Sequence, residues 1–189
     1  MSTLSLQEFR RLILAGTLPP TVVAYHCGSK LTGGKFSVDY IGSGEGLLAL
    51  GPGIYFATDK DTAMLYCKYV RDPWFYTVEV RTSGLYRVGS LSMDPSLAPV
   101  WKKLKAAEQD WIAKGHKTLY FDPSSLSEGS RLKDGPGYVG KFVKALGQKK
   151  GRDLLLSLGI TGAVEKLSSD YEIAVYEPSI VRVLQAEPL

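Results

Sequence analysis

Residues 162–186, GAVEKLSSDYEIAVYEPSIVRVLQA, contain three runs typical of β-strands in close succession: GAVEKL, EIAVYEP and IVRVLQA. Because few of the strand-like runs are separated by helical segments, we do not expect repeated βαβ units. Earlier runs of the same kind are TVVAYHC at 21–27, GIYFAT at 53–58 and WFYTVEVR at 74–81. Together they predict a mixed α+β fold.

The whole chain has the composition of one ordinary globular domain. It has 189 residues, 44% hydrophobic and 22% charged, enough for one sizeable core over residues 1–189. The formal net charge of +4 is too small to mark a dedicated nucleic-acid binder without a clustered patch. No window approaches the roughly 18 apolar residues of a membrane helix, and arginines interrupt the start MSTLSLQEFRRLILAG, where a signal peptide would be apolar. We therefore expect a cytoplasmic protein with no membrane partner.

Cysteine usage predicts neither cross-links nor a metal site. Cys27 and Cys67 are the two cysteines of the chain, too few for a disulfide framework and without metal-ligand spacing. Reduced thiols and no metal are expected. A small buried side chain is the commoner role for such a cysteine.

Helical spacing predicts helices over residues 5–16, 60–70, 99–114 and 141–158. Residues 28–53 are rich in glycine and are expected to form a long loop that covers a substrate, with a second loop at 124–140. Basic residues gather on the last two helices, where they are usually solvated faces. If both groups faced one site, they would attract a nucleic-acid acceptor. These residues are Lys102, Lys103, Lys105, Lys141, Lys144, Lys149, Lys150 and Arg152.

Three features could carry chemistry, and each also has a plain structural interpretation. His26 ends an apolar strand, where a hydrogen-bonded structural histidine is the commoner case. The segment GPGIYFA at 51–57 joins glycines, which permit close backbone approach, to Tyr55, which alone would be a core tyrosine after a turn. Glu172 lies in the otherwise apolar EIAVY, so it is either an exposed strand end or a carboxylate held in a cleft.

In combination these features resemble the ADP-ribosyltransferase family. The match is to its His-Tyr-Glu branch, which contains the poly(ADP-ribose) polymerases and the diphtheria-toxin-like enzymes. It rests on strand-end His26, on GPGIYFA followed by Tyr66 eleven residues after Tyr55, and on Glu172 four residues before the turn YEPS. The C-terminal segment is also similar to that of small bacterial and phage members. Recognisable segments cover residues 20–80 and 155–185, whereas 85–150 resemble nothing.

The resemblance implies two roughly orthogonal antiparallel sheets with NAD in the cleft between them. It implies transfer of a single ADP-ribose from NAD, the co-substrate, with release of nicotinamide. Cleavage of the nicotinamide–ribose bond passes through an oxocarbenium-like state that a fixed carboxylate stabilises, the role implied for Glu172. Glu172 would also bond the ribose hydroxyl, and Tyr55 and Tyr66 would form two walls against the nicotinamide ring.

The same resemblance assigns further NAD contacts around His26. His26 would bond the adenosine ribose, backbone groups after it would hold the carboxamide, and Ser29 would be a further donor. Gly53 and Ala63 belong to the matching motif around Tyr55. The family places Gly directly after this His, whereas here Cys27 intervenes before Gly28. We therefore expect the carboxamide contact to come from the Cys27 backbone, with a β-bulge beyond it.

The acceptor stays open between a protein side chain and a nucleic-acid base. Small members of the branch often act as toxins or effectors, which implies an antitoxin or immunity protein as a partner. An NAD glycohydrolase, with water as acceptor, and a non-catalytic NAD-binding or interaction module are the alternatives. An RNA 2′-phosphotransferase should show several arginines and a second histidine around the site, and these are not recognisable in the sequence.

Overall fold

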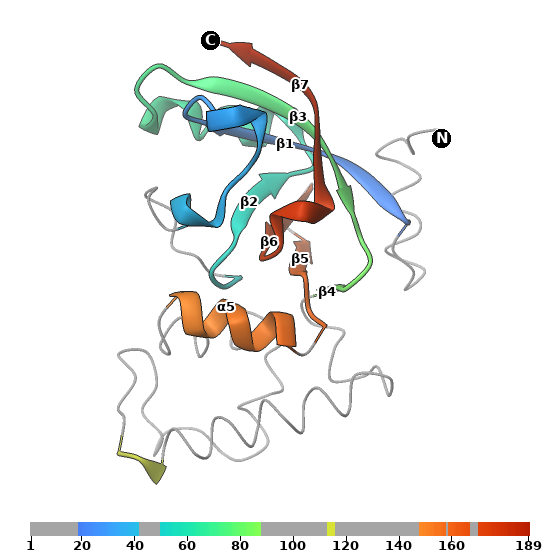
Figure 1. The fold of residues 1–189 in the computed structure, drawn as a ribbon. Coiled ribbons are helices and arrows are strands. Elements are labelled where there is room, and N and C mark those ends of the chain that lie inside the picture. Colours follow the sequence, from blue (N-terminus) through green and yellow to red (C-terminus); the bar gives the residue numbers. More distant parts are fainter. Residues whose placement is uncertain (1–18, 42–49, 88–112, 116–147, 158, 167–169) are drawn as a thin grey trace.

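The computed structural model describes residues 19–41, 50–87, 113–115, 148–157, 159–166 and 170–189. The strands are β1 (Thr21–Gly28), β2 (Ile54–Ala57), β3 (Trp74–Arg81), β4 (Leu85–Arg87), β5 (Gly162–Lys166), β6 (Tyr171–Val175) and β7 (Val181–Pro188). The α-helices are α2 (Lys60–Met64) and α5 (Gln148–Ser157). Short 3-10 helices are η1 (Thr32–Gly34), η2 (Val38–Tyr40), η3 (Cys67–Tyr69) and η6 (Pro178–Ile180) (Figure 1).

The mixed α+β class and all six strand predictions named above are confirmed within the described residues. The helix expected over 60–70 is shorter, because α2 ends at Met64 and the chain continues into η3. α5 confirms the later part of the 141–158 prediction, whose first residues lie outside the described part. The helix at 5–16 and the loop at 124–140 lie outside it, as does the helix at 99–114 apart from residues 113 and 114.

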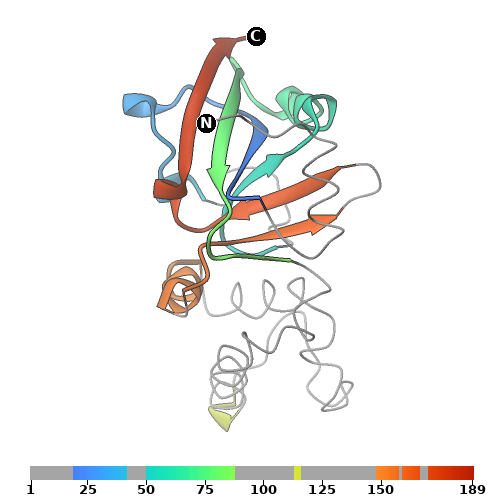
Figure 2. The same cartoon turned by 90° about the vertical axis from the view of Figure 1, so that its right-hand side faces the viewer.

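All seven strands belong to one hydrogen-bonded sheet, in the order β4-β5-β6-β2-β1-β3-β7. The two roughly orthogonal sheets that the resemblance implies correspond here to two halves of one continuous sheet, in which β4 pairs with β5 in parallel. The two halves of the sheet meet at β1 and β2, which share a single residue pair, Tyr25 with Ala57. Figure 2 shows β3 and β7 crossing the direction of β5 and β6 steeply. One narrow junction thus joins two differently oriented halves.

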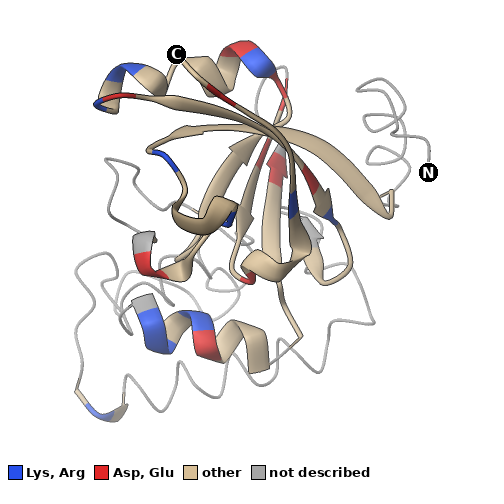
Figure 3. Ribbon diagram, turned by 45° about the horizontal axis from the view of Figure 1, so that its top comes forward, with Lys and Arg blue, Asp and Glu red and all other residues tan. Residues whose placement is uncertain are grey.

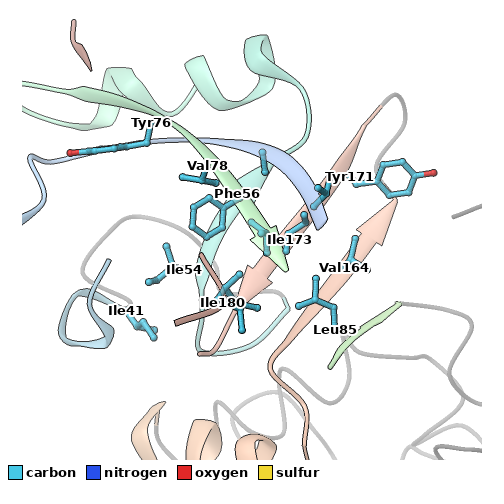
Figure 4. Close-up of a cluster of buried hydrophobic side chains, with 14 residues drawn as sticks. Ile41, Ile54, Phe56, Tyr76, Val78, Leu85, Val164, Tyr171, Ile173 and Ile180 are labelled. Atoms are coloured by element: carbon cyan, nitrogen blue, oxygen red, sulfur yellow. The ribbon is translucent and has the colours of Figure 1, made fainter. Parts of the chain in front are cut away.

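The main core fills one face of this sheet. Alternate positions of a strand share a face, and the apolar alternation of β1 and β3 places their buried residues together. Ile41 after η2 and Ile180 of η6 close over the same face (Figure 4). Burial of each large side chain contributes about 1.5–3 kcal/mol. The core comprises Val22, Ala24, Ile41, Ile54, Phe56, Tyr76, Val78, Val80, Leu85, Val164, Tyr171, Ile173, Val175 and Ile180.

A smaller cluster lies on the opposite face, beneath α2. It consists of buried Cys27, Ala57, Ala63 and Phe75, with Tyr25 and Cys67 partly buried against them. Asp59 caps α2 by accepting from the Thr62 N–H at 2.9 Å. This cluster positions the α2–η3 segment, which we define as residues 60–69, over the junction of β1 and β2.

Candidate active site

Tyr55 and Glu172 lie on one face of two paired strands. β2 and β6 are antiparallel, with Ala57 directly opposite Glu172. Because Tyr55 is two residues before Ala57, Tyr55 and Glu172 are diagonal neighbours on the face opposite the main core, within reach of each other's side chains. The Tyr55 hydroxyl accepts from the Leu50 N–H at 2.8 Å and donates to the Gly51 carbonyl at 2.9 Å. These two bonds fix the Tyr55 ring and the turn before β2.

Glu172 has a markedly perturbed ionisation. On β5, Glu165 lies directly opposite Glu172 on the same face of the sheet. Burial, followed by the negative charges of Glu165 and Asp170, raises the pKa of Glu172 to about 7. The carboxyl is therefore about half ionised at neutral pH. A carboxyl whose charge is costly in the free protein gains most from a cation placed beside it.

Tyr66 lies on the α2–η3 segment above this face. It is 49% exposed, and its N–H donates to the Ala63 carbonyl at 3.2 Å. Partial burial raises the pKa of Tyr66, and the charges of Glu172 and Asp170 add to the effect. Glu172 also contributes to raising the pKa of Tyr55. The structure thus places Tyr55 beside Glu172 on neighbouring strands, and Tyr66 on the segment that packs against the same face.

His26 lies on the opposite face of β1 and reaches the same strand junction through a hydrogen bond. Its Nδ1 is 2.8 Å from the Tyr55 carbonyl oxygen. Because a carbonyl only accepts, Nδ1 carries the proton and Nε2 is left as an acceptor. Burial lowers the pKa of His26, which keeps the ring neutral. The ring packs at 5.3 Å from Phe36 and 5.5 Å from Phe56, measured between centroids.

The backbone of β1 beyond Tyr25 has an open edge toward β2. Continuing the Tyr25–Ala57 register would set Cys27 opposite Tyr55, but in the described structure β1 and β2 separate there. The Tyr55 carbonyl accepts from the His26 side chain instead of from a β1 amide. Backbone groups on such an edge can bond an amide-containing ligand. The predicted bulge is absent through Gly28, because the β1–β3 register is continuous to that residue.

Two of the predicted glycines have steric reasons. A Cβ on Gly28 would lie 2.5 Å from His26 Nε2, so the imidazole occupies the space that a side chain would need. A Cβ on Gly53 would lie 2.9 Å from the Val175 carbonyl oxygen, where β2 begins against the end of β6. Gly28 therefore makes room for His26, and Gly53 permits close packing of two strands.

Ser29 and Ala63 occupy different surroundings from each other. The Ser29 side chain is exposed, and its carbonyl accepts from the Tyr76 hydroxyl at 2.9 Å. The same hydroxyl accepts from the Leu31 N–H at 2.9 Å, so Tyr76 holds the turn after β1. Ala63 is buried in the small cluster under the α2–η3 segment. Its carbonyl accepts from the Tyr66 N–H, so buried Ala63 helps to position Tyr66.

The cysteines correct the expectation of reduced thiols. Cys27 and Cys67 form a disulfide, with their Cα atoms 5.2 Å apart. Forty residues separate them in sequence, and only the packing of the α2–η3 segment on β1 brings them together. Cysteine count alone therefore could not reveal the bond.

Sequence reasoning missed four residues around the site. Phe36 and Tyr76 enclose the His26 ring, and Glu165 and Asp170 act on the Glu172 carboxyl. Asp170 is 2% exposed, and its Oδ2 has no hydrogen-bond partner among the described residues. The alternation GAVEKL followed by YEIAV could have indicated Glu165, because an antiparallel register with a short connection sets the two glutamates opposite each other.

The described basic residues of the predicted cluster lie on α5. α5 lies below the sheet, whereas the α2–η3 segment lies beside its upper end (Figures 1 and 3). The Lys149 Nζ is 2.7 Å from the Asp153 Oδ2, one turn along the helix. Lys149, Lys150 and Arg152 thus do not border the tyrosines, while the other five predicted basic residues lie outside the described part.

The described residues also bear on metal binding and on membrane-spanning helices. They include no group of three or more His, Cys, Asp or Glu side chains that could hold a metal ion. In the same part of the chain, no helix is both long and apolar enough to cross a membrane. No family model, curated protein or solved structure matches this chain.

Proposed function

We propose that this protein is an NAD-dependent mono-ADP-ribosyltransferase with an ADP-ribosyltransferase-like fold of the His-Tyr-Glu branch. The observation that carries the proposal is the position of Tyr55 and Glu172 as diagonal neighbours on one face of β2 and β6, with the α2–η3 segment that carries Tyr66 packed against the same face. Two of the three motifs that resemble the family thus supply one carboxylate and two tyrosines to this face and the segment over it, and the third motif supplies His26. In this proposal NAD is a co-substrate and no metal takes part.

The chemistry of these groups suits NAD. The nicotinamide ring carries a positive charge, which half-exposed Tyr66 and half-buried Tyr55 can face with their rings. The open edge of β1 at Cys27 offers backbone groups to the carboxamide. His26 Nε2 can accept a hydrogen bond from a ribose hydroxyl, because Nδ1 is committed to the Tyr55 carbonyl.

Glu172 supplies the catalytic role. In the free protein, burial and the charges of Glu165 and Asp170 disfavour the ionised form of Glu172, whereas a positive charge on the substrate favours that ionised form. Charge that develops on the ribose as nicotinamide leaves is then stabilised by a fixed carboxylate in partly dry surroundings. This is differential binding of the transition state, so loss of the charge should cost turnover more than affinity.

The direct test is label transfer from adenylate-labelled NAD to separate cellular protein and RNA fractions. Glu172→Gln removes the charge with little change of shape. Glu187→Gln is the matched control, because Glu187 lies on edge strand β7 at the far side of the sheet. Wild type and Glu187→Gln should label one fraction, and Glu172→Gln should not.

The outcomes separate the open acceptors. Protease-sensitive label identifies a protein side chain, and nuclease-sensitive label identifies a nucleic acid. Nicotinamide release without label in either fraction would replace the transferase by an NAD glycohydrolase. Binding of NAD with no release would reduce the proposal to a binding module.

A further inference from the structure

The disulfide connects two segments of the candidate site. Cys27 directly follows His26 at the open edge of β1, and Cys67 directly follows Tyr66 on the α2–η3 segment. One covalent bond therefore links β1 to the α2–η3 segment, next to the proposed NAD contacts His26 and Tyr66. Whether this bond is present decides how firmly the Tyr66 wall is held to β1.

Few buried side chains hold the α2–η3 segment to the sheet. Ala63 is its one fully buried residue, whereas Leu65 is 64% exposed and Tyr69 is 57% exposed. The Asp59 side chain caps the first turn of α2, whereas the side chain of Tyr66, the N-cap residue of η3, makes no capping hydrogen bond. Segments with few buried apolar side chains open locally at low cost. Lys60 adds one contact to β3, its Nζ lying 5.3 Å from the Phe75 ring centroid, and the disulfide is the covalent tie between the segment and the sheet.

The two sulfur atoms differ in access. Cys27 is 7% exposed within β1, while Cys67 is only partly buried near the exposed side chains of the α2–η3 segment. A thiolate must approach one sulfur of a disulfide in order to exchange with it. Cys67 is therefore the sulfur open to attack, and Cys27 is the leaving thiolate.

We propose that the Cys27–Cys67 bond is a reversible redox modification site that controls the Tyr66 wall of the candidate NAD site, with a dithiol reductant as its substrate. The first thiolate of the reductant bonds to the Cys67 sulfur and releases Cys27 as a thiolate. The second thiolate then attacks the reductant's own sulfur in that mixed disulfide and releases Cys67. Two electrons pass to the protein, both cysteines take up protons, and the reductant ends as its cyclic disulfide.

The oxidised form is the binding-competent one. In it Tyr66 is held over Glu172, whereas in the reduced form the α2–η3 segment is free to leave the sheet. His26 keeps its bond to the Tyr55 carbonyl in both forms, because neither residue belongs to the released segment. This inference rests on the proposed function for its NAD readout, but release of the segment is independent of any ligand.

The test compares the full chain in oxidised form, after reduction by dithiothreitol, and after reoxidation. Hydrogen exchange of residues 60–69 relative to β1 and β3 reports release of the segment, and titration with NAD reports the site. Reduction should remove protection from 60–69 alone and weaken NAD binding by roughly threefold to tenfold, the worth of one aromatic contact. Reoxidation should restore both. Cys67→Ala should show the hydrogen exchange and NAD affinity of the reduced protein, and neither should change on addition of dithiothreitol.

Four other results would decide against one of the two proposals. Unchanged protection of 60–69 after complete reduction would overturn the proposal, as would two free thiols in protein treated with an oxidant. Unchanged NAD affinity despite a released segment would also overturn control of the site. Release of the segment in a protein that binds no NAD in either form would support the redox site and contradict the proposed function.

Discussion

Glu172 gives the proposed reaction a specific pH dependence. Its pKa of about 7 in the free protein means that the ionised form, which the chemistry requires, is lost below neutrality. We expect kcat/KM for nicotinamide release to fall about tenfold per pH unit below 7 and to level off above it. The pH profile of kcat should have a lower midpoint, since the cationic ring of bound NAD favours the carboxylate.

The control for this profile is Glu165→Gln. Removing one of the charges that raise the pKa of Glu172 should move the kcat/KM midpoint to lower pH while the fold is kept. A midpoint that stays in place would mean that Glu165 does not act on the rate-determining carboxyl. A profile without any ionisation near 7 would remove Glu172 from that role.

The same carboxyl should make the folded protein less stable at high pH. Its folded-state pKa lies above the ordinary value, so its stabilising contribution is fully present below about 4.5 and is lost as pH rises through 7. Glu172→Gln should therefore unfold like wild type near pH 4 and be more stable at pH 8, by on the order of 1–2 kcal/mol after discounting for solvent screening. Urea unfolding at both pH values measures this. Equal stability at pH 8 would contradict the burial of the charge.

Gly28 tests the placement of His26. In Gly28→Ala the new methyl group would lie 2.5 Å from His26 Nε2, so the imidazole would have to shift from its packed position. The fold should survive, with a change in Tm of a few degrees at most, whereas NAD affinity should fall because His26 loses its position. Thermal unfolding together with NAD titration separates the two effects. A variant with unchanged affinity would show that His26 does not contact NAD.

At the residue scale, sequence reasoning named the residues on which the proposed site rests and missed those that act on them. His26, Tyr55, Tyr66 and Glu172 belong to motifs that can be read along the chain. The effect of Glu165 on Glu172 depends on strand register, which local patterns do not specify.

Among the elements, the α2–η3 segment depends most on one bond. The disulfide closes a loop with a sequence separation of 40, for which the chain-entropy account gives at most about 4 kcal/mol of stabilisation. We expect reduction to lower the Tm by roughly 5–15 °C. Scanning calorimetry with and without dithiothreitol measures the shift. Cys67→Ala should show the lower Tm with and without dithiothreitol. A wild-type Tm that does not change on reduction would contradict a contribution of the disulfide to stability.

The strands were predictable at this scale because their alternation is strong. TVVAYHC and WFYTVEVR became β1 and β3, paired along their full lengths. The helix over 60–70 was only partly right, because its periodicity arises from a short helix and a 3-10 turn that both pack on the small cluster, through Ala63 and Cys67. Local spacing cannot distinguish these two cases.

For the whole molecule, composition and strand order predicted an α+β domain but not a single continuous sheet. The difference comes from one pair, Tyr25 with Ala57, which joins the two halves. Beyond that pair the Tyr55 carbonyl accepts a hydrogen bond from the His26 side chain, and β1 and β2 are no longer paired. The same contact that interrupts the β1–β2 ladder thus creates the open edge on which the proposed site depends.

Single-turnover release of nicotinamide from saturating NAD, with NAD affinity measured in parallel, tests the central claim most directly. The account predicts that Glu172→Gln binds NAD within about threefold of wild type and releases nicotinamide at least a hundredfold more slowly, since the charge acts mainly in the transition state. Glu187→Gln should equal wild type in both. Release by Glu172→Gln at the wild-type rate would contradict the assignment of Glu172 as the catalytic carboxylate.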